Sequence, residues 1–183
     1  MTELIYIHSK LMIVDDKILI CGSANINDRS LLGSRDSEVA LFIEDEHFTQ
    51  GIMNGAQVKC GKLVGALRKQ LMNEHLGSPN FDVQDCISDK FYKDIWFTTA
   101  AKNTKIFDEI FLCIPADHVK TMEENKNYLN QRPMAETDKF AAFEKLKEIQ
   151  GYLVLLPLLY LESENLTPNY FTKEFLAPTM MWT

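Results

Sequence analysis

Four polar residues of types that occur in catalytic sites lie close together near the start of the chain. They are His8, Lys10, Ser23 and Asn25, and each sits beside or within an apolar run. A neutral imidazole can act as a nucleophile, and a protonated one can act as an acid. A lysine supplies positive charge for phosphate oxygens, while hydroxyl and amide groups donate hydrogen bonds to those oxygens as they gain charge. Together these residue types suit attack on a phosphodiester.

A β-hairpin would bring the four residues to one face. Two apolar runs flank the polar pair Asp15-Asp16, which predicts a tight turn between two strands. With a two-residue loop, His8 lies opposite Ser23, and alternation along the strand puts Lys10 on the same face as His8. Asp-Asp is a poor two-residue turn, and a three-residue loop would shift the register by one and turn Ser23 away.

The spacing of these residues matches a known signature. The pattern His8-x-Lys10-x4-Asp15-x6-Gly22-Ser23-x-Asn25 resembles the motif of the phospholipase D superfamily. The run from Ile-His-Ser-Lys at 7–10, through Gly-Ser-Ala-Asn-Ile-Asn-Asp-Arg-Ser-Leu-Leu-Gly at 22–33, to Arg-Asp-Ser-Glu at 35–38 is more specific. It resembles the second catalytic motif of the eukaryotic, phosphoinositide-regulated phosphatidylcholine phospholipases D. The resemblance extends to the final Trp182-Thr183, which is how that family ends.

The resemblance implies an α/β fold in which a mixed sheet is flanked by helices in a sandwich. Residues 1–77 would form the region of the second catalytic motif. Residues 78–183 would form a C-terminal extension of helices and a strand, with the terminal tail packed on the same domain. Residues 4–14 have the composition of a buried strand, yet almost nothing precedes them to supply neighbouring strands. We therefore expect the chain to be the incomplete second half of a larger protein.

The implied activity is hydrolysis of phosphatidylcholine to phosphatidate and choline, with transfer to primary alcohols as an alternative. In this family two similar halves share one active site, one His becomes a phosphohistidine, and the other protonates the leaving alcohol. The family's order of halves assigns His8 to the acid role and then to the base role. The full set of implied roles is catalysis by His8, Lys10 and Asp15, substrate binding by Ser23 and Asn25, orientation of His8 by Glu38, and docking of Thr183 near the site.

Two of these roles also have a local interpretation. By its position Asp15 is a turn residue, several strand positions from Lys10, so the residue types alone do not make it a proton shuttle. Glu38 opens an apolar strand and could be a solvated strand end. With the resemblance, it becomes the carboxylate that fixes the tautomer of His8.

The resemblance also implies partners and a place in the cell. No metal or other cofactor is expected for the chemistry, and a phosphoinositide activator is implied by the resemblance only, since the sequence has no polybasic cluster. The expected partners are the N-terminal catalytic half, a phosphatidylcholine membrane surface and Rho-type small GTPases. We expect a cytoplasmic protein that is peripheral on the cytosolic face of cellular membranes.

Composition restricts the alternatives. The net charge of −7 weighs against binding to nucleic acid, which favours basic proteins. The four cysteines have no C-x-x-C or metal-ligand spacing, so they indicate free thiols in a reducing compartment. The first residues lack the basic region of a signal peptide, and no apolar run reaches membrane-spanning length.

The remaining sequence predicts further strands and helices by periodicity. The predicted strands are 37–43 and 152–161, and the predicted helices are 58–76 ending at Gly77, one capped by Ser88, 106–111, 117–130 and 138–150.

Two other functions stay open at this point. One is a small nuclease or phosphodiesterase with a single motif, which would homodimerise to pair two copies of His8. Such a protein would need strands ahead of the motif, and the acidic charge argues against it. The other is a truncated, non-catalytic binding or regulatory module, which fits a half-site that lacks a partner histidine.

Overall fold

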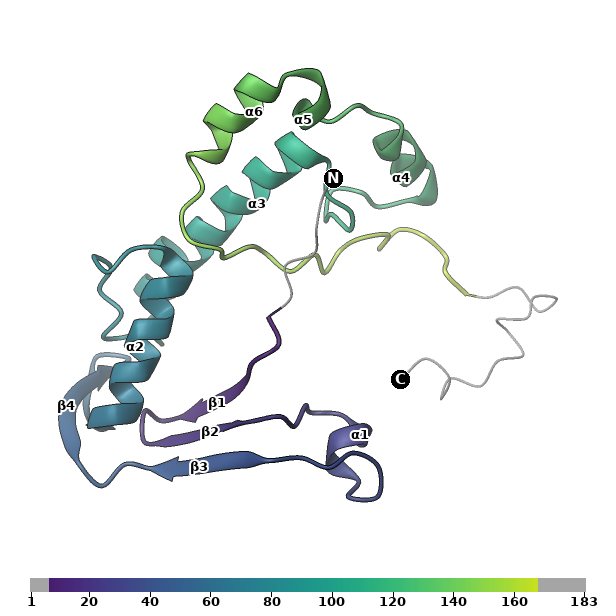
Figure 1. Cartoon of the computed structure of the whole chain (residues 1–183). Helices are drawn as coiled ribbons and strands as arrows, with labels where there is room; N and C mark the ends of the chain where they lie inside the picture. Colours follow the sequence, from purple (N-terminus) through teal and green to yellow (C-terminus); the bar gives the residue numbers. More distant parts are fainter. Residues whose placement is uncertain (1–6, 168–183) are drawn as a thin grey trace.

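The computed structural model describes residues 7–167 of the chain, and it is a mixed α/β structure (Figure 1). Its strands and helices, in chain order, are β1 (Lys10–Val14), β2 (Ile18–Gly22), α1 (Asp28–Leu31), β3 (Ala40–Glu44), β4 (Phe48–Met53), β5 (Ala56–Gly61), α2 (Lys62–Leu76), the π-helix η1 (Phe91–Phe97), α3 (Thr98–Phe111), α4 (Met122–Leu129), α5 (Met134–Thr137) and α6 (Lys139–Leu146). The α/β class expected from the resemblance is therefore confirmed, with small antiparallel sheets and helices.

The first sheet has the order β1-β2-β3 and contains the predicted hairpin and third strand. Lys10 pairs with Gly22, and Val14 pairs with Ile18, so three residues separate the strands. The prediction of a two-residue loop is therefore wrong, and the three-residue alternative holds.

Tertiary contacts explain this turn. Asp15 and Asp16 both take positive φ, at 52° and 54°, a region that aspartate tolerates better than most residues. The Lys17 amide donates to the Val14 carbonyl at 2.9 Å, which closes the tight part of the turn. The Asp16 side chain is only 2% exposed, and Arg68 of α2 donates to its two oxygens from Nε and Nη2, each at 2.7 Å. Burial of this pair fixes a turn that the local sequence disfavours.

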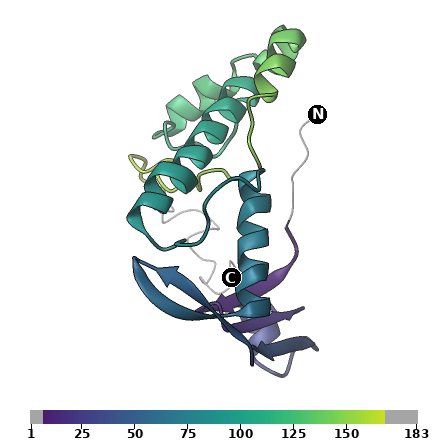
Figure 2. The ribbon, with the colours of Figure 1, turned by 90° about the vertical axis from the view of Figure 1, so that its left-hand side faces the viewer.

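Helix α2 stands between the sheet and the other helices (Figures 1 and 2). It begins at Lys62, later than predicted, because residues 58–61 belong to β5, a strand of the β4–β5 hairpin that periodicity did not predict. Asp45 satisfies the first turn of the helix by accepting hydrogen bonds from the amides of Leu63 and Val64. Gly77 ends the helix in the left-handed conformation, as predicted.

The helical part of the structure has two small cores. One joins the end of α2 to η1 and α3, and its buried residues are Leu76, Val83, Phe91, Ala100 and Leu153. The other joins α3 to α6 through Ile106, Ile110 and Ala142. Predicted helices are present at altered bounds, since α3 begins well before residue 106, whereas α4 and α6 are shorter than expected.

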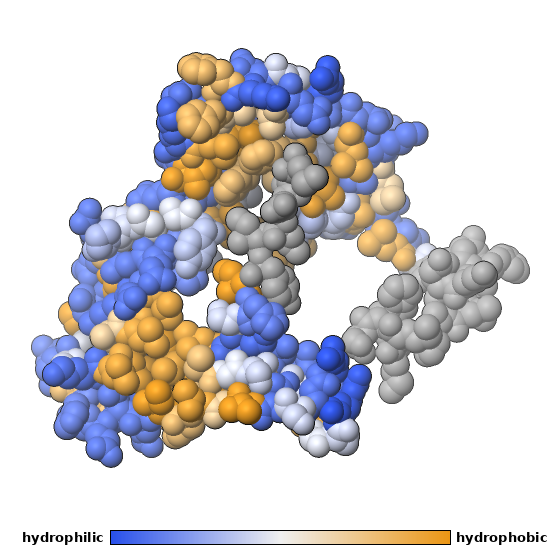
Figure 3. All heavy atoms as spheres, in the orientation of Figure 1, coloured by the Kyte–Doolittle hydropathy of each residue, from blue (hydrophilic) through white to orange (hydrophobic). Residues whose placement is uncertain are grey.

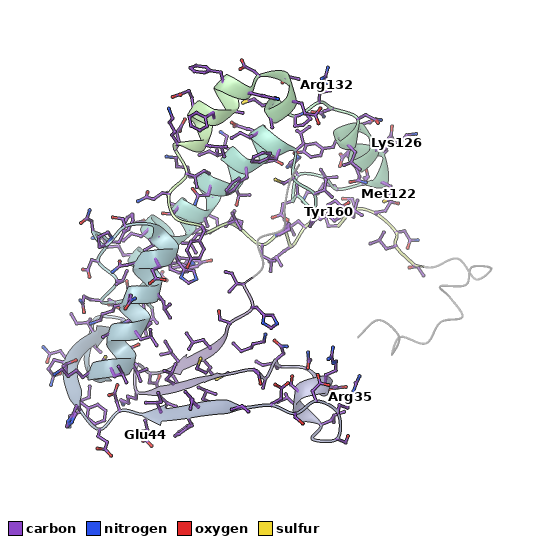
Figure 4. The ribbon with its side chains drawn as sticks, viewed as in Figure 1. Arg35, Glu44, Met122, Lys126, Arg132 and Tyr160 are labelled. Atoms are coloured by element: carbon purple, nitrogen blue, oxygen red, sulfur yellow. The ribbon has the colours of Figure 1, made fainter. Side chains whose placement is uncertain are left out.

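The predicted strand at 152–161 is wrong, because this segment pairs with no strand in the part of the chain that the structure describes and residues 159–161 lie in a bend and a turn. Side chains of α3 take its backbone groups instead. Asn103, which is fully buried, donates to the carbonyls of Gln150 and Leu153 at 2.8 and 2.9 Å. Further along, the Tyr160 hydroxyl donates to Asn125 of α4 at 2.9 Å (Figure 4).

Hydrophobic surface gathers over β1–β3 (Figure 3). Met12, Val14, Ile20 and Phe42 alternate onto one face of this sheet, and all four side chains are exposed. No helix within residues 7–167 combines the length and the apolar character needed to cross a bilayer.

The buried pair predicts a large stability difference between two arginine substitutions. Arg68→Met leaves the Asp16 carboxylate buried without its partner, which costs about 3–5 kcal/mol when a buried pair is broken. Arg29→Met removes only the exposed pair between Arg29 and Asp36 and should cost less than about 1 kcal/mol. Urea unfolding followed by far-ultraviolet circular dichroism measures both free energies. Similar losses for the two variants would contradict the role given to Arg68.

Candidate functional site

The candidate site lies at the end of the first sheet where β1 begins. Figure 4 shows Arg35 near this end, beside α1, and Glu44 at the opposite end. His8 is exposed and precedes β1 by two residues. Lys10 opens the strand, and its Nζ donates to the backbone carbonyl of His8 at 2.7 Å. The ammonium group is therefore held close to the backbone of the candidate catalytic histidine.

Ser23 and Glu38 form a second polar group beside the first. Because Gly22 pairs with Ala40, the residue after β2 lies next to the residues that lead into β3. The Ser23 hydroxyl donates to the Glu38 carboxylate and accepts a hydrogen bond from the Val39 amide at 3.0 Å. Glu38 thus joins the turn after β2 to the start of β3.

The electrostatic environment keeps Glu38 ionised. Its hydrogen bond from Ser23 is the largest cause that lowers the pKa of this carboxyl, followed by a hydrogen bond from Ser30. Desolvation acts in the opposite direction and raises the pKa, whereas the positive charges of Lys10 and Arg29 lower it further. The Glu38 carboxylate and the Lys10 ammonium therefore attract each other, although Glu38 is bonded to Ser23 and Lys10 to the His8 carbonyl.

Lys10 and Asn25 line a cavity of about 360 Å³ whose other walls are mostly apolar. A short loop that folds back on itself holds Asn25 there, because the backbone amide of Asn25 donates to the Ser30 hydroxyl at 3.1 Å. The Ser30 amide in turn donates to the side chain of Asn27, which caps α1. The loop and α1 therefore place an amide side chain and a cation around one opening.

The structure brings the predicted residues together in two groups. Lys10 and Asn25 share the cavity, whereas Ser23 bonds to Glu38. Because the register differs by one residue from the two-residue hairpin, Ser23 no longer pairs opposite His8, and the expected convergence of four groups on one face is wrong in that respect. The functional roles of these residues, including orientation of His8 by Glu38, stay predictions.

Two other predicted residues lie away from this opening. Asp15 is exposed and occupies the turn at the far end of β1 from Lys10, so its assignment to the catalytic set stays a prediction. Thr183 lies outside the described residues, as does its predicted docking near the site.

Sequence reasoning missed Ser30 and Asp16. Ser30 connects the cavity group of Lys10 and Asn25 with the Ser23–Glu38 group. Its hydroxyl accepts a hydrogen bond from the backbone amide of Asn25, and it also contributes to the lowered pKa of Glu38. It belongs to the Ile-Asn-Asp-Arg-Ser run that carries the resemblance, so a signal for it was present. Asp16 had no such signal, because its partner Arg68 lies 52 residues away in sequence.

The described residues include no group of three or more His, Cys, Asp and Glu side chains arranged to hold a metal ion. The groups that are present suit an anion instead. A cation, an amide and a hydroxyl can receive phosphate oxygens, and an imidazole can exchange a proton with an ester oxygen.

Comparison with known proteins identifies the same family. A family model described as Phospholipase D matches residues 2–123. The chain is 44% identical to phospholipase D1 of Rattus norvegicus and 41% identical to phospholipase D2 of Bos taurus, and each alignment covers all of this chain. The chain is also 42% identical to phospholipase D zeta 2 of Arabidopsis thaliana, in an alignment that covers 95% of this chain. The chain spans only 17–20% of the length of these three relatives.

The Ser23 hydrogen bond predicts a pH effect. A carboxyl with a lowered pKa stabilises the folded state above its unfolded pKa, and this contribution is lost as the pH falls through the folded value. Ser23→Ala should therefore raise the pKa of Glu38 and move the loss of this contribution to higher pH. Carbon-13 NMR titration of the Glu38 carboxyl measures the change.

Ser9→Ala is the matched control, because Ser9 lines the cavity but no hydrogen bond joins it to Glu38 among the described contacts. An unchanged Glu38 titration in Ser23→Ala would contradict the assigned cause of the shift.

Proposed function

The chain belongs to the phospholipase D family, and on that premise we propose that it supplies the second catalytic half of an enzyme that hydrolyses phosphatidylcholine to phosphatidate and choline. The observation that carries the proposal is Lys10, held at the backbone of His8 and lining a cavity with Asn25, within a motif of the family's spacing. The first half of the active site, with its own His and Lys, comes from a segment outside this chain.

The reaction proceeds in two steps. In the first, the histidine of the other half attacks phosphorus and forms a P–N bond while the P–O bond to choline breaks. His8, as an imidazolium, gives its proton to the departing choline oxygen. In the second step, neutral His8 takes a proton from water, and the hydroxide attacks phosphorus and releases the histidine with phosphatidate. A primary alcohol can replace water in this step and gives a phosphatidyl alcohol.

The other residues stabilise these steps. Lys10 and the matching lysine of the other half neutralise the phosphate oxygens. These oxygens carry the most negative charge in the transition state, when phosphorus has five ligands. Asn25 donates hydrogen bonds to these oxygens, and Ser23 does so when its hydroxyl turns from Glu38 to the substrate. Glu38 stays ionised because its pKa is lowered, and it accepts a hydrogen bond from the second ring nitrogen of His8. Asp15 belongs to the catalytic motif and lies in the turn between β1 and β2.

The proposal includes the surroundings of the enzyme. The chemistry uses no metal or other cofactor, and a phosphoinositide acts only as an activator. The complete enzyme works at a phosphatidylcholine membrane surface on the cytosolic side, as a peripheral protein, with Rho-type GTPases as regulators and no nucleic-acid partner. Thr183 docks near the pocket and holds the motif strands.

A homodimeric phosphodiesterase is the rival arrangement. Turnover by the isolated chain that rises with the square of its concentration would favour it.

A chimera tests the role of His8. Rat phospholipase D1 with its matching segment replaced by this chain should hydrolyse phosphatidylcholine, because the two sequences align along this whole chain. His8→Asn in the chimera should lower kcat by at least about 10²–10⁴-fold, the usual contribution of general acid catalysis. His47→Asn is the matched control, because His47 is exposed in the connection between β3 and β4. An inactive chimera, or a loss below tenfold for His8→Asn, would contradict the proposal.

The covalent intermediate predicts a change of product. Ethanol added to the active chimera should divert phosphatidate to phosphatidylethanol, because both acceptors attack the same phosphohistidine. EDTA should leave the rate unchanged when the lipid is presented in metal-independent mixed micelles, because side chains supply the nucleophile and the positive charge. Lipid products are separated and quantified by mass spectrometry. Hydrolysis without any phosphatidylethanol, or activity restored only by added metal, would count against this mechanism.

A further inference from the structure

The loop that carries Glu38 connects α1 to β3 and has no helix or strand of its own. Hydrogen bonds hold this loop at two points. The Asp36 amide donates to the Arg29 carbonyl of α1 at 3.1 Å. The Val39 amide donates to the Ser23 hydroxyl, just after β2, at 3.0 Å. Glu38 therefore lies on a short stretch of chain whose two ends are attached to different elements.

An ion pair strengthens the attachment of this loop to α1. Arg29 Nη2 lies 2.8 Å from Asp36 Oδ2, so side chains and backbone join the same two residues. The two side chains are 66% and 38% exposed, and an ion pair this open to water adds little to the free energy of unfolding. The pair acts on position instead, because it closes the loop against the helix.

Helix α1 depends on such polar contacts for its own position. It buries none of its residues, so apolar packing does not fix it. Ser30 instead accepts a hydrogen bond from the Asn25 backbone amide at 3.1 Å and donates one to the Glu38 carboxylate. A hydroxyl can do both at once, because it has one proton and two lone pairs. A shift of α1 would therefore move a hydrogen-bond donor of Glu38.

We propose that Arg29 and Asp36 are positioning residues, and that their ion pair places the Glu38 carboxylate for the reaction. The inference rests on the proposed function in taking Glu38 as the group that orients His8. With the pair intact, Ser30 reaches the carboxylate. With the pair broken, the loop moves away from α1, that hydrogen bond is lost, and the carboxylate turns toward water. Both residues of the pair thus act through Glu38 and not by contact with the phosphate.

The groups around Glu38 give the test a definite sign. Hydrogen bonds from Ser23 and then Ser30 are the largest causes that lower the pKa of this carboxyl. The charges of Lys10 on β1 and Arg29 on α1 lower the pKa further, while desolvation raises it. Loss of the Ser30 contact should therefore raise the pKa of Glu38.

Asp36→Ala separates positioning from charge. When charge alone acts, removal of a nearby negative group lowers the pKa of a carboxyl. Loss of the positioning pair predicts the opposite, a raised pKa of Glu38. Carbon-13 NMR titration of the Glu38 carboxyl in the full 183-residue chain measures the direction without any turnover. A lowered or unchanged pKa of Glu38 in Asp36→Ala would overturn the inference.

Arginine variants give the matched comparison. Arg29→Met should also raise the pKa of Glu38, whereas Arg29→Lys keeps a cation that can reach Asp36 and should recover most of the wild-type value. Arg35→Met is the control, because Arg35 lies next to Asp36 beside α1 and forms no ion pair among the described residues (Figure 4). It should leave the titration of Glu38 unchanged. An equal rise in Arg29→Met and Arg35→Met would assign the effect to net charge and would overturn the inference.

The rat phospholipase D1 chimera tests the consequence for catalysis. Asp36→Ala and Arg29→Met should each lower kcat by about tenfold or more, since a displacement of about 1 Å can cost about 100-fold in rate. KM should stay the same, because the pair does not touch the substrate, and Arg35→Met should keep the kcat of the parent chimera. An unchanged kcat, or a change in KM alone, would overturn the inference. An inactive parent chimera would contradict the proposed function, and the titration of Glu38 would still decide whether the pair positions this carboxylate.

Discussion

The buried ion pair between Arg68 and Asp16 is the interaction on which the position of the candidate site depends. It connects α2 to the turn between β1 and β2, and Arg68 Nη1 also donates to the Val83 carbonyl at 2.6 Å, in the segment that leads to η1. The Asp16 carbonyl accepts a hydrogen bond from the Gly61 amide at 2.7 Å, which joins β5 to the same point. Arg68 therefore joins the hairpin to the segment that leads to η1, and the backbone of its partner Asp16 joins the hairpin to β5. Desolvation of the two charges offsets much of their attraction, so the net contribution of the pair to stability is smaller than the cost of removing one partner.

The register that follows from this turn decides the shape of the site. With three residues in the loop, Lys10 pairs with Gly22 instead of Cys21, and the backbone of Val39 and Ala40 approaches Gly22 so closely that a side chain would not fit there. The pairing of β2 with β3 places Ser23 against the residues before β3, where it bonds to Glu38. The site consequently has a cationic, apolar opening and a separate anionic group, connected through Ser30.

Under the proposed function, the described polar groups form one half of a catalytic site. One histidine, one lysine and a cluster of hydrogen-bond donors lie at the end of a sheet whose Met12, Ile20 and Phe42 side chains are exposed to water. The exposed face, the incomplete catalytic set and the coverage of about a fifth of the relatives' length are consistent with one another. Under the proposed function, the chemistry depends on a second polar cluster that faces this one across phosphorus, and this chain positions one of the two clusters through its hairpin.

Local sequence patterns were sufficient for several features of this protein. The two apolar runs that flank Asp15-Asp16 predicted the hairpin of β1 and β2, Gly77 marked the end of α2, and the spacing from His8 to Asn25 pointed to the family and its candidate residues. Tertiary structure decided the loop length and register, because Arg68 lies 52 residues from the Asp16 that it holds. It also decided that Cys60 belongs to a strand, since this residue fits a helical period equally well. Residues 152–161 form no strand, because side chains of Asn103 and Thr104 bind the Leu153 carbonyl and the Leu155 amide near the start of this segment. Contacts between residues distant in sequence leave no periodic signal, so only the folded chain could show them.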